Sequence, residues 1–192
     1  MIKAGIIGGA GYTGGELLRL LLRHPQATVT FVQSRSQAGK PVSSVHTDLL
    51  GDTDLVFTAE AGKNVDVLFL CLGHGESKTW LDQQTPDPNL RVIDLSHDYR
   101  AGGVWGGRSF QYGLPELHRE RIRQAGLIAN PGCFATALQL ALLPLAANGV
   151  LGDVYATGIT GATGAGQTLS ATSHFPWRHA NVSAYKTLQH QH

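Results

Sequence analysis

A glycine-rich turn between an apolar run and a leucine-rich run is the feature that most constrains the fold of this chain. The letters GIIGGAGYTGGEL place Gly8, Gly11 and Gly14 at GxxGxxG spacing, directly after a strand-like segment at 2–8. Leucines at helical spacing follow, as far as Pro25. Such glycines allow a tight turn, and the N–H groups of the helix start can face a pyrophosphate. The context predicts a dinucleotide-binding unit; the alternative is a corner that needs glycines only for packing.

Strand-like and helix-like segments alternate along the first part of the chain, which predicts an α/β fold with a Rossmann-type, doubly wound parallel sheet. After Gly149 the pattern changes to Gly, Thr, Ser and His, with one strand-like stretch at Val154–Ile159. We therefore expect a nucleotide-binding domain at 1–132 and the start of an α+β substrate (dimerisation) domain at 133–192. The further strands are expected at 28–34, 65–73, 90–96 and 126–130, and the helices at 76–84, 116–124 and 134–148.

The composition argues against several classes of function. The chain has 192 residues, 42% of them apolar, and a net charge of +1, which gives no electrostatic basis for binding nucleic acid or an acidic membrane surface. No signal peptide is visible, and the longest apolar run is broken by Gln139 and Pro144, so no membrane span is expected. Cys71 and Cys133 match no metal or redox spacing, so we expect no metal site and a cytoplasmic location.

The end of the second expected strand bears on the choice of nucleotide. An NAD site usually has an acidic residue there for the ribose 2′-hydroxyl, but this chain has Gln33, Ser34, Arg35 and Ser36. Arg35 can pair with a 2′-phosphate and the serines can hydrogen-bond to it. NADP is therefore the expected cofactor; the alternative is a solvated loop arginine.

Cys133 stands between an Asn-Pro-Gly turn and an Ala/Leu-rich helix. A thiolate at a helix N-terminus is stabilised by the helix dipole and by nearby N–H groups, which can also stabilise an oxyanion. Taken alone, such a cysteine can equally be a buried structural residue. A dinucleotide site together with a reactive thiol suggests hydride transfer to or from a thioester. His190 and His192 are candidate acid/base groups, although a polar chain end is an equal alternative.

Several motifs, in the same order along the whole chain, are those of one enzyme family. They are GIIGGAGYTGGELLRLL, SRSQAGKPVSSVH, VIDLSHDYR, YGLPEL, NPGCFATA, GITGATGAG and AYKTLQHQH. With them the sequence resembles the N-acetyl-γ-glutamyl-phosphate reductases, arginine-biosynthesis enzymes of the semialdehyde dehydrogenase family. Two segments depart from the family pattern without removing a reacting group: Leu72–Gly75 stands where the family has LPHG, and Phe134-Ala135 follow the cysteine.

The resemblance implies roles for individual residues. Cys133 would attack an acyl phosphate, NADPH would reduce the thioester to a semialdehyde, and His190 or His192 would act as acid/base. The substrate would be a small acyl phosphate, and a homo-oligomer is expected. The family's cofactor contacts would fall on Gly8, Gly11, Tyr12, Thr13, Gly14, Ser34, Arg35, Gly161, Gly164 and Gly166, and its substrate contacts on Tyr112, Glu116, Asn130 and Gly132.

The family's HxH segment normally continues beyond the point that corresponds to His192, so the resemblance implies that this chain is truncated and that it could lack activity. Two alternatives remain open. The chemistry can be the same with aspartyl phosphate or an N-succinyl or other N-blocked glutamyl phosphate as substrate. The chain can also be a non-catalytic nucleotide-binding module in which Cys133 is a core residue.

Overall fold

The computed structural model describes residues 1–188. His190 and His192, the predicted acid/base candidates, lie outside the described residues. The chain divides into two compact units, Met1–Gly132 and Cys133–His192, and each is described by itself.

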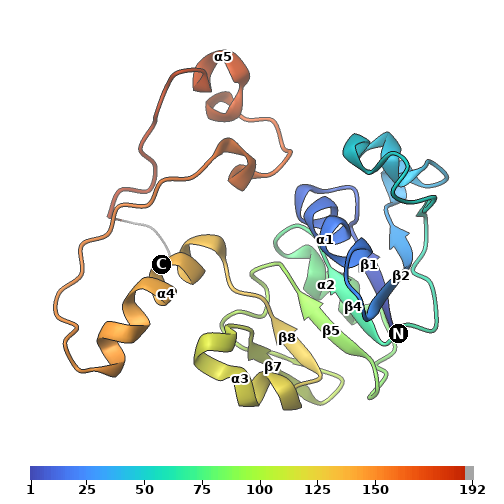
Figure 1. Ribbon diagram of the computed structural model, residues 1–192, viewed down its shortest axis with the longest axis horizontal. Coiled ribbons are helices and arrows are strands. Elements are labelled where there is room, and N and C mark those ends of the chain that lie inside the picture. The colour runs from blue at the N-terminus through green and yellow to red at the C-terminus, as the bar shows by residue number, and fades with distance from the viewer. Residues whose placement is uncertain (189–192) are drawn as a thin grey trace. The chain divides into compact units, whose positions relative to one another are not determined.

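The first unit is built on a sheet whose strands follow in the order β3-β2-β1-β4-β5-β8-β7-β6. All neighbouring strands are parallel except β6 and β7, which form an antiparallel pair at one edge (Figure 1). The predicted α/β fold with a doubly wound parallel sheet is therefore confirmed. The strands are β1 (Ile2–Ile7), β2 (Ala27–Gln33), β3 (Phe57–Thr58), β4 (Val67–Leu70), β5 (Arg91–Asp94), β6 (Val104–Trp105), β7 (Arg108–Tyr112) and β8 (Leu127–Ala129).

Successive side chains of a strand point to opposite faces of the sheet, and in this sheet both faces are covered. Ala4 and Ile6 of β1 belong to the hydrophobic cluster that contains Leu18 and Leu21 of helix α1 (Tyr12–Leu22). Ile7 belongs to the other cluster, to which helix α2 (Glu76–Asp82) contributes Leu81. Full burial of one such side chain is worth about 1.5–3 kcal/mol, so these two clusters supply the main stabilisation of the unit.

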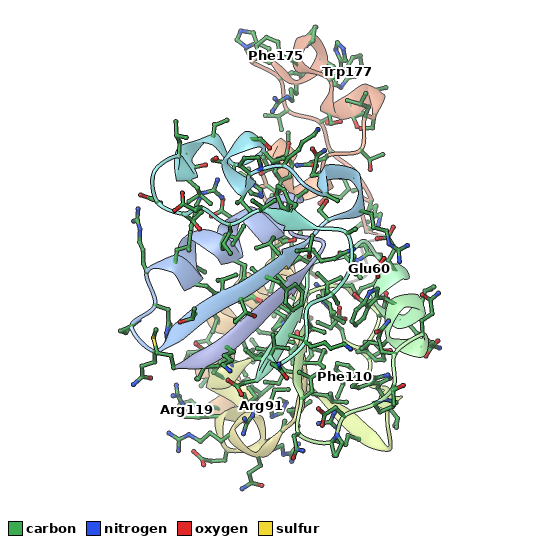
Figure 2. The ribbon with its side chains drawn as sticks, turned by 90° about the vertical axis from the view of Figure 1, so that its right-hand side faces the viewer. Glu60, Arg91, Phe110, Arg119, Phe175 and Trp177 are labelled. Atoms are coloured by element: carbon green, nitrogen blue, oxygen red, sulfur yellow. The ribbon has the colours of Figure 1, made fainter. Side chains whose placement is uncertain are left out.

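The strand pair β6–β7 at the edge of the sheet was not predicted from the sequence. Trp105 and Phe110 anchor it, since both are buried in the cluster on the α2 side, and Figure 2 shows Phe110 within the packed side chains of the unit. The Trp105 indole N–H donates to the carbonyl of Leu81 at 2.9 Å. Helix α3 (Pro115–Gln124) then leads to β8, which inserts between β5 and β7.

The second unit begins with helix α4 (Cys133–Ala147) and ends, within the described residues, with the short helix α5 (Phe175–Arg178). None of its described residues is buried, and Phe175 and Trp177 project from α5 as exposed side chains (Figure 2). The predicted strand at Val154–Ile159 is wrong, because that stretch has no regular structure. A strand needs a neighbour for its backbone hydrogen bonds, and the described part of this unit contains no other strand.

Candidate functional site

The glycine turn follows β1 at the point where the strand order reverses, with β2 on one side of β1 and β4 on the other. Gly8 has φ +76°, and a Cβ there would lie 2.5 Å from the carbonyl oxygen of Cys71. A Cβ at Gly14 would lie 2.7 Å from the Cα of Gly9. These positions therefore need glycine, and the crevice at such a switch point is where doubly wound sheets bind ligands.

Helix α1 starts directly after this turn, with Gly11 at its N-cap and no side chain capping it. The amides of Tyr12 and Thr13 have no acceptor within the helix, as in the first turn of any α-helix. A pyrophosphate would supply acceptors for them, and its negative charge suits the positive end of the helix dipole. The turn and the helix start therefore fit a dinucleotide.

Cys71 lies under this turn and is buried. Burial raises the pKa of its thiol to about 12, an effect that the hydrogen bond with the Thr13 side chain opposes. Such a thiol stays protonated near neutral pH. Cys71 is therefore part of the support of the turn rather than a nucleophile.

The end of β2 combines a buried amide with an exposed arginine. The Gln33 side chain donates from Nε2 to the carbonyl of Ala59 at 2.9 Å, and its Oε1 lies 3.4 Å from the amide of Gly8. Ser34 is buried, with its hydroxyl 3.4 Å from that of Ser36, whereas Arg35 is exposed. The amide of Gln33 is thus used within the protein, and the groups that remain for a ligand are on Ser34 and Arg35.

The loops after β4 and β5 bring together a polar cluster that sequence reasoning missed. The rings of His74 and His97 stack, and His97 Nδ1 lies 2.9 Å from Oδ1 of Asp98. Asp98 accepts hydrogen bonds from the amides of Gly75 and Lys78, so it caps the start of α2. No local spacing reveals this cluster, because its members meet only through the pairing of β4 with β5.

The segment before the thiol is held by the loop after β5. Arg100 donates from Nε to the carbonyl of Asn130 at 2.9 Å and from an Nη to the carbonyl of Leu95 at 2.9 Å. Asp94, the last residue of β5, accepts from the amide and hydroxyl of Ser96. Arg100 therefore supports the backbone of the Asn-Pro-Gly turn.

The other predicted substrate residues of the first unit lie at the same edge of the sheet. Tyr112 ends β7 and is half-buried, and the next amide, of Gly113, donates to the carbonyl of Ala129 at 2.9 Å. Asn130 follows β8 and is exposed, and Gly132 is buried. Glu116, in the first turn of α3, is exposed. The ends of β7 and β8 thus bring Tyr112 and Asn130 together.

In the second unit, Cys133 is the first residue of α4 and its thiol is exposed. A negative charge at this end of a helix of 15 residues is stabilised by the first-turn amides. The predicted cofactor glycines lie at a single 3₁₀ turn, Ala162–Ala165: Gly164 is within it, Gly161 and Gly166 flank it, and Gly166 has φ +79°. The described residues of the unit therefore present an accessible thiol and an accessible glycine-rich turn.

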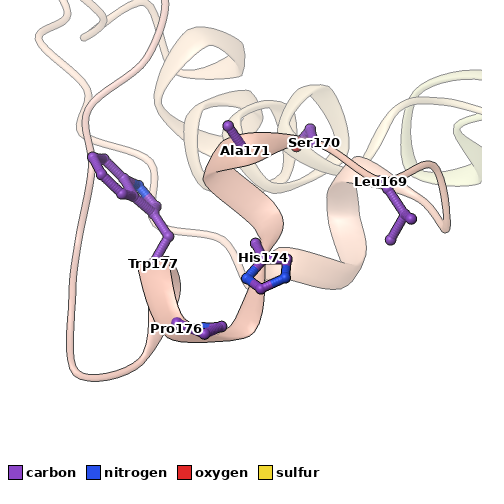
Figure 3. Close-up of a pocket in the computed structure, with 6 residues that line it drawn as sticks. All are labelled: Leu169, Ser170, Ala171, His174, Pro176 and Trp177. Carbon is purple, nitrogen blue, oxygen red and sulfur yellow. The ribbon is translucent and has the colours of Figure 1, made fainter.

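A pocket in the second unit contains none of the predicted site residues. It is lined by Leu169, Ser170, Ala171, His174, Pro176 and Trp177 (Figure 3). Among residues 1–188, no group of three or more His, Cys, Asp or Glu side chains is placed to hold a metal ion. Nor does that part of the chain contain a helix long and apolar enough to cross a membrane.

Two family models match the chain. The NAD-binding domain of semialdehyde dehydrogenases matches residues 3–125, and the dimerisation domain of semialdehyde dehydrogenases matches residues 133–192. The chain belongs to the semialdehyde dehydrogenase family. Its first unit is accordingly a nicotinamide-dinucleotide domain, in agreement with the fit of the glycine turn.

Curated relatives are similar over the whole of this chain. The N-acetyl-γ-glutamyl-phosphate reductase of Christiangramia forsetii is 55% identical over 193 residues, and that of Parabacteroides distasonis is 54% identical over 194 residues. In both comparisons the match covers 100% of this chain and 60% of the relative. The chain thus spans 60% of the length of these relatives.

Solved structures share the fold at lower identity. Aspartate semialdehyde dehydrogenase with NADP from Candida albicans matches with a TM-score of 0.55 and 20% identity, covering 79% of this chain and 48% of the other. Aspartate semialdehyde dehydrogenase II from Vibrio cholerae, complexed with ASA, matches with a TM-score of 0.57 and 21% identity, covering 76% and 46%. These likenesses support the fold alone.

Proposed function

We propose that the protein to which this chain belongs reduces N-acetyl-γ-glutamyl phosphate to N-acetylglutamate semialdehyde and phosphate, with NADPH, in arginine biosynthesis. The observation that carries the proposal is the 55% identity to a reductase of that name along the entire chain. We assign cofactor binding to residues 1–132 and thiol chemistry to the domain that begins at Cys133.

The arrangement at the end of β2 supports NADP over NAD. The last residue of β2 is Gln33, whose side chain is engaged with the backbone of Ala59. The position offers no carboxylate for a ribose 2′-hydroxyl. Arg35 is exposed beside Ser34, and a guanidinium is well suited to bind a phosphate dianion.

The exposed thiol of Cys133 supports a covalent route. In this route the thiolate attacks the acyl carbon, the carbon–oxygen bond to phosphate breaks, and phosphate leaves with a proton. NADPH supplies the hydride that the carbonyl carbon of the resulting thioester receives. The carbon–sulfur bond then breaks, which releases the aldehyde and restores the thiolate. The first-turn amides of α4 can stabilise the negative oxygen in each addition step.

We infer that the remaining predicted residues orient the substrate and move the proton. We assign Tyr112, Asn130, Gly132 and Glu116 to substrate binding, and Gly161, Gly164 and Gly166 to cofactor binding. A histidine, His190 or His192, exchanges the proton with the phosphate and the thiol. The match to a dimerisation domain supports a homo-oligomer, and the two free cysteines are in keeping with a reducing, cytoplasmic compartment.

The decisive experiment runs the reaction in reverse. NADP⁺ reduction is followed with N-acetylglutamate semialdehyde, with and without phosphate, using this chain and a version extended to the length of the relatives. We expect phosphate-dependent formation of NADPH by the extended protein. Reduction with aspartate semialdehyde or an N-succinyl analogue instead would identify a different acyl phosphate. Absence of turnover with all of them, while NADP⁺ still binds, would contradict the enzyme proposal.

Two substitutions test the assigned roles. Cys133→Ser should abolish turnover while NADP⁺ binding stays nearly intact, and wild-type activity in that variant would refute the thioester route.

Arg35→Ala should weaken the binding of NADP⁺ far more than the binding of NAD⁺. Lys40→Ala is the matched control, because it removes the same charge from the same loop, where the Lys40 amine donates to Oε1 of Gln37 at 3.1 Å. Equal losses of NADP⁺ and NAD⁺ affinity in Arg35→Ala would mean that the 2′-phosphate binds elsewhere.

A further inference from the structure

His46 lies in the segment that connects β2 to β3, yet its side chain reaches the glycine turn. The residue is 7% exposed, and its Nε2 lies 2.8 Å from the carbonyl oxygen of Gly9. A carbonyl oxygen can only accept a hydrogen bond, so Nε2 carries a proton and the ring donates. The Gly9 carbonyl is therefore held by a side chain from another part of the first unit.

The backbone of Gly9 is also held through its N–H. Its N–H donates to the carbonyl of Gln33 in β2 at 2.9 Å. Since this amide is engaged within the protein, the donors left for a pyrophosphate are those of the first turn of α1, at Tyr12 and Thr13. The N–H and the carbonyl of Gly9 belong to two successive peptide groups, and a hydrogen bond holds each of them, so the backbone that leads into α1 is fixed on both sides of Gly9.

The His46 ring also packs against the side of α1. A Cβ at Gly15 would lie 2.6 Å from Cε1 and 2.7 Å from Nδ1 of the ring. Two residues after His46, Asp48 forms an ion pair with Arg19 of α1, with Oδ2 at 2.7 Å from Nε and Oδ1 at 2.7 Å from Nη2. The ion pair anchors the segment to the helix, and the ring packs on the helix at a glycine. Together these contacts fix the position of the imidazole.

We propose that His46 is a positioning residue of the dinucleotide site: its Nε2–H holds the Gly9 carbonyl and so fixes the turn that presents the α1 amides to the pyrophosphate of the cofactor. His46 acts through Gly9 and makes no contact of its own with the cofactor. The inference rests on the nicotinamide-dinucleotide domain, and only the choice of NADP⁺ as the main probe rests on the proposed function.

The test compares two variants by calorimetric titration with NADP⁺ and with adenosine 2′-phosphate, which has no pyrophosphate. His46→Leu removes the donor and should raise the Kd for NADP⁺ about tenfold, the effect of one lost buried hydrogen bond. It should leave the Kd for adenosine 2′-phosphate within about twofold, the precision usual for such comparisons. His46→Gln keeps an N–H near the ε position and should bind NADP⁺ within about threefold of the unaltered chain.

Asp48→Asn is the matched control, because it weakens the anchoring of the segment and leaves the bond to Gly9 in place. We expect a lower unfolding midpoint and a nearly unchanged Kd for NADP⁺. Equal weakening in His46→Leu, His46→Gln and Asp48→Asn, or equal weakening for both ligands, would reduce His46 to a packing residue and overturn the proposal.

Three further outcomes bear on the role of His46. If His46→Leu does not fold, Gly15→Ala replaces it, because the new Cβ must displace the ring; an unchanged Kd for NADP⁺ in that variant would overturn the proposal. If the unaltered chain binds NAD⁺ in preference, only the choice of cofactor is wrong, and the same comparison is made with NAD⁺ and AMP. If it binds neither dinucleotide, both proposals fall.

Discussion

The imidazole rings of His74 and His97 stack with centroids 4.3 Å apart and planes 7° from parallel. The amide of His97 also donates to Nδ1 of His74 at 3.3 Å, which favours a neutral His74 ring. The pair joins the loop after β4 to the loop after β5. Partial burial, the neighbouring His97 and Arg100 together lower the pKa of His74 below its ordinary 6.5.

The lowered pKa makes this contact sensitive to acid. Because the folded protein binds the proton of His74 less readily than the unfolded chain does, stability is full above about pH 6.5 and decreases as the pH falls toward the folded pKa. His97→Ala should raise the His74 pKa toward 6.5, as measured by NMR titration of the ring protons. His24→Ala, which removes an exposed histidine after α1, is the control and should leave that titration unchanged.

The carboxylate of Asp98 should stabilise the first unit at neutral pH. Its side chain is only 4% exposed, and burial by itself raises the pKa. Hydrogen bonds from the amides of Lys78 and Gly75, and from His97, outweigh that effect and hold the pKa below 3.8. Asp98→Asn should therefore cost about 1–2 kcal/mol in the free energy of unfolding at pH 7.

The sign of the pH effect follows from the direction of the shift. A lowered carboxyl pKa gives stability that is present above the unfolded value and is lost as the pH falls through the folded value. The difference between the unaltered chain and Asp98→Asn should thus shrink below about pH 3.8 in urea unfolding. Asp82→Asn, at the exposed end of the same helix, is the control and should change the unfolding free energy at pH 7 by less than about 0.5 kcal/mol. A constant difference for Asp98→Asn would mean that its charge is irrelevant.

Two glycines of the same turn should respond differently to alanine. At Gly11 a Cβ would meet only the carbonyl oxygen of Gly8, at 3.6 Å, and the backbone φ of −75° suits alanine. Gly11→Ala should change the unfolding free energy by less than about 0.5 kcal/mol. At Gly14 the Cβ would lie 2.7 Å from both Cα and O of Gly9.

Gly14→Ala should destabilise the chain by about 1–3 kcal/mol and weaken dinucleotide binding. In an open helix the same change would stabilise by about 1 kcal/mol, so the sign of the measured effect separates close packing from helix propensity. Urea unfolding of the two variants is the measurement. A stabilised Gly14→Ala would show that the turn and α1 do not pack as described.

The two thiols should differ in reactivity. Burial raises the pKa of Cys71 to about 12, and Cys71 is inaccessible, whereas Cys133 is exposed. Iodoacetamide near neutral pH should therefore modify Cys133 and spare Cys71, and mass spectrometry of peptides can tell them apart. In concentrated urea both should react. Modification of folded protein at Cys71 as fast as at Cys133 would contradict the packing under the glycine turn.

The sequence was sufficient to predict the elements that have long, regular apolar patterns. The segments 2–8 and 28–34 correspond to β1 and β2, and the helix expected at 134–148 corresponds to α4. The glycine turn could be predicted because its glycines follow a local spacing that is visible in the sequence. Ser34 and Arg35 follow β2 as expected, although their roles stay predictions.

Other features depend on contacts between distant segments and could not be predicted from local patterns. The strand β7 reads RSFQY. Before Tyr112 its one large apolar residue is the buried Phe110, so the pattern resembles a loop. The expected strand at Val154–Ile159 had the right residues but has no neighbour among those described. His46 ends the motif SRSQAGKPVSSVH, but the motif did not indicate its role, since its partner Gly9 lies in a different element.

The strand order has a consequence for how the chain folds as it is synthesised. β8 is the last strand of the first unit to be made, yet it lies between β5 and β7. Until Leu127–Ala129 leave the ribosome, the hairpin of β6 and β7 has no parallel strand to join, and Trp105 and Phe110 stay without their full covering. The nascent nucleotide domain is therefore an incomplete sheet with an unpaired, aggregation-prone edge. That edge is paired only when its last strand, of three residues, has been synthesised.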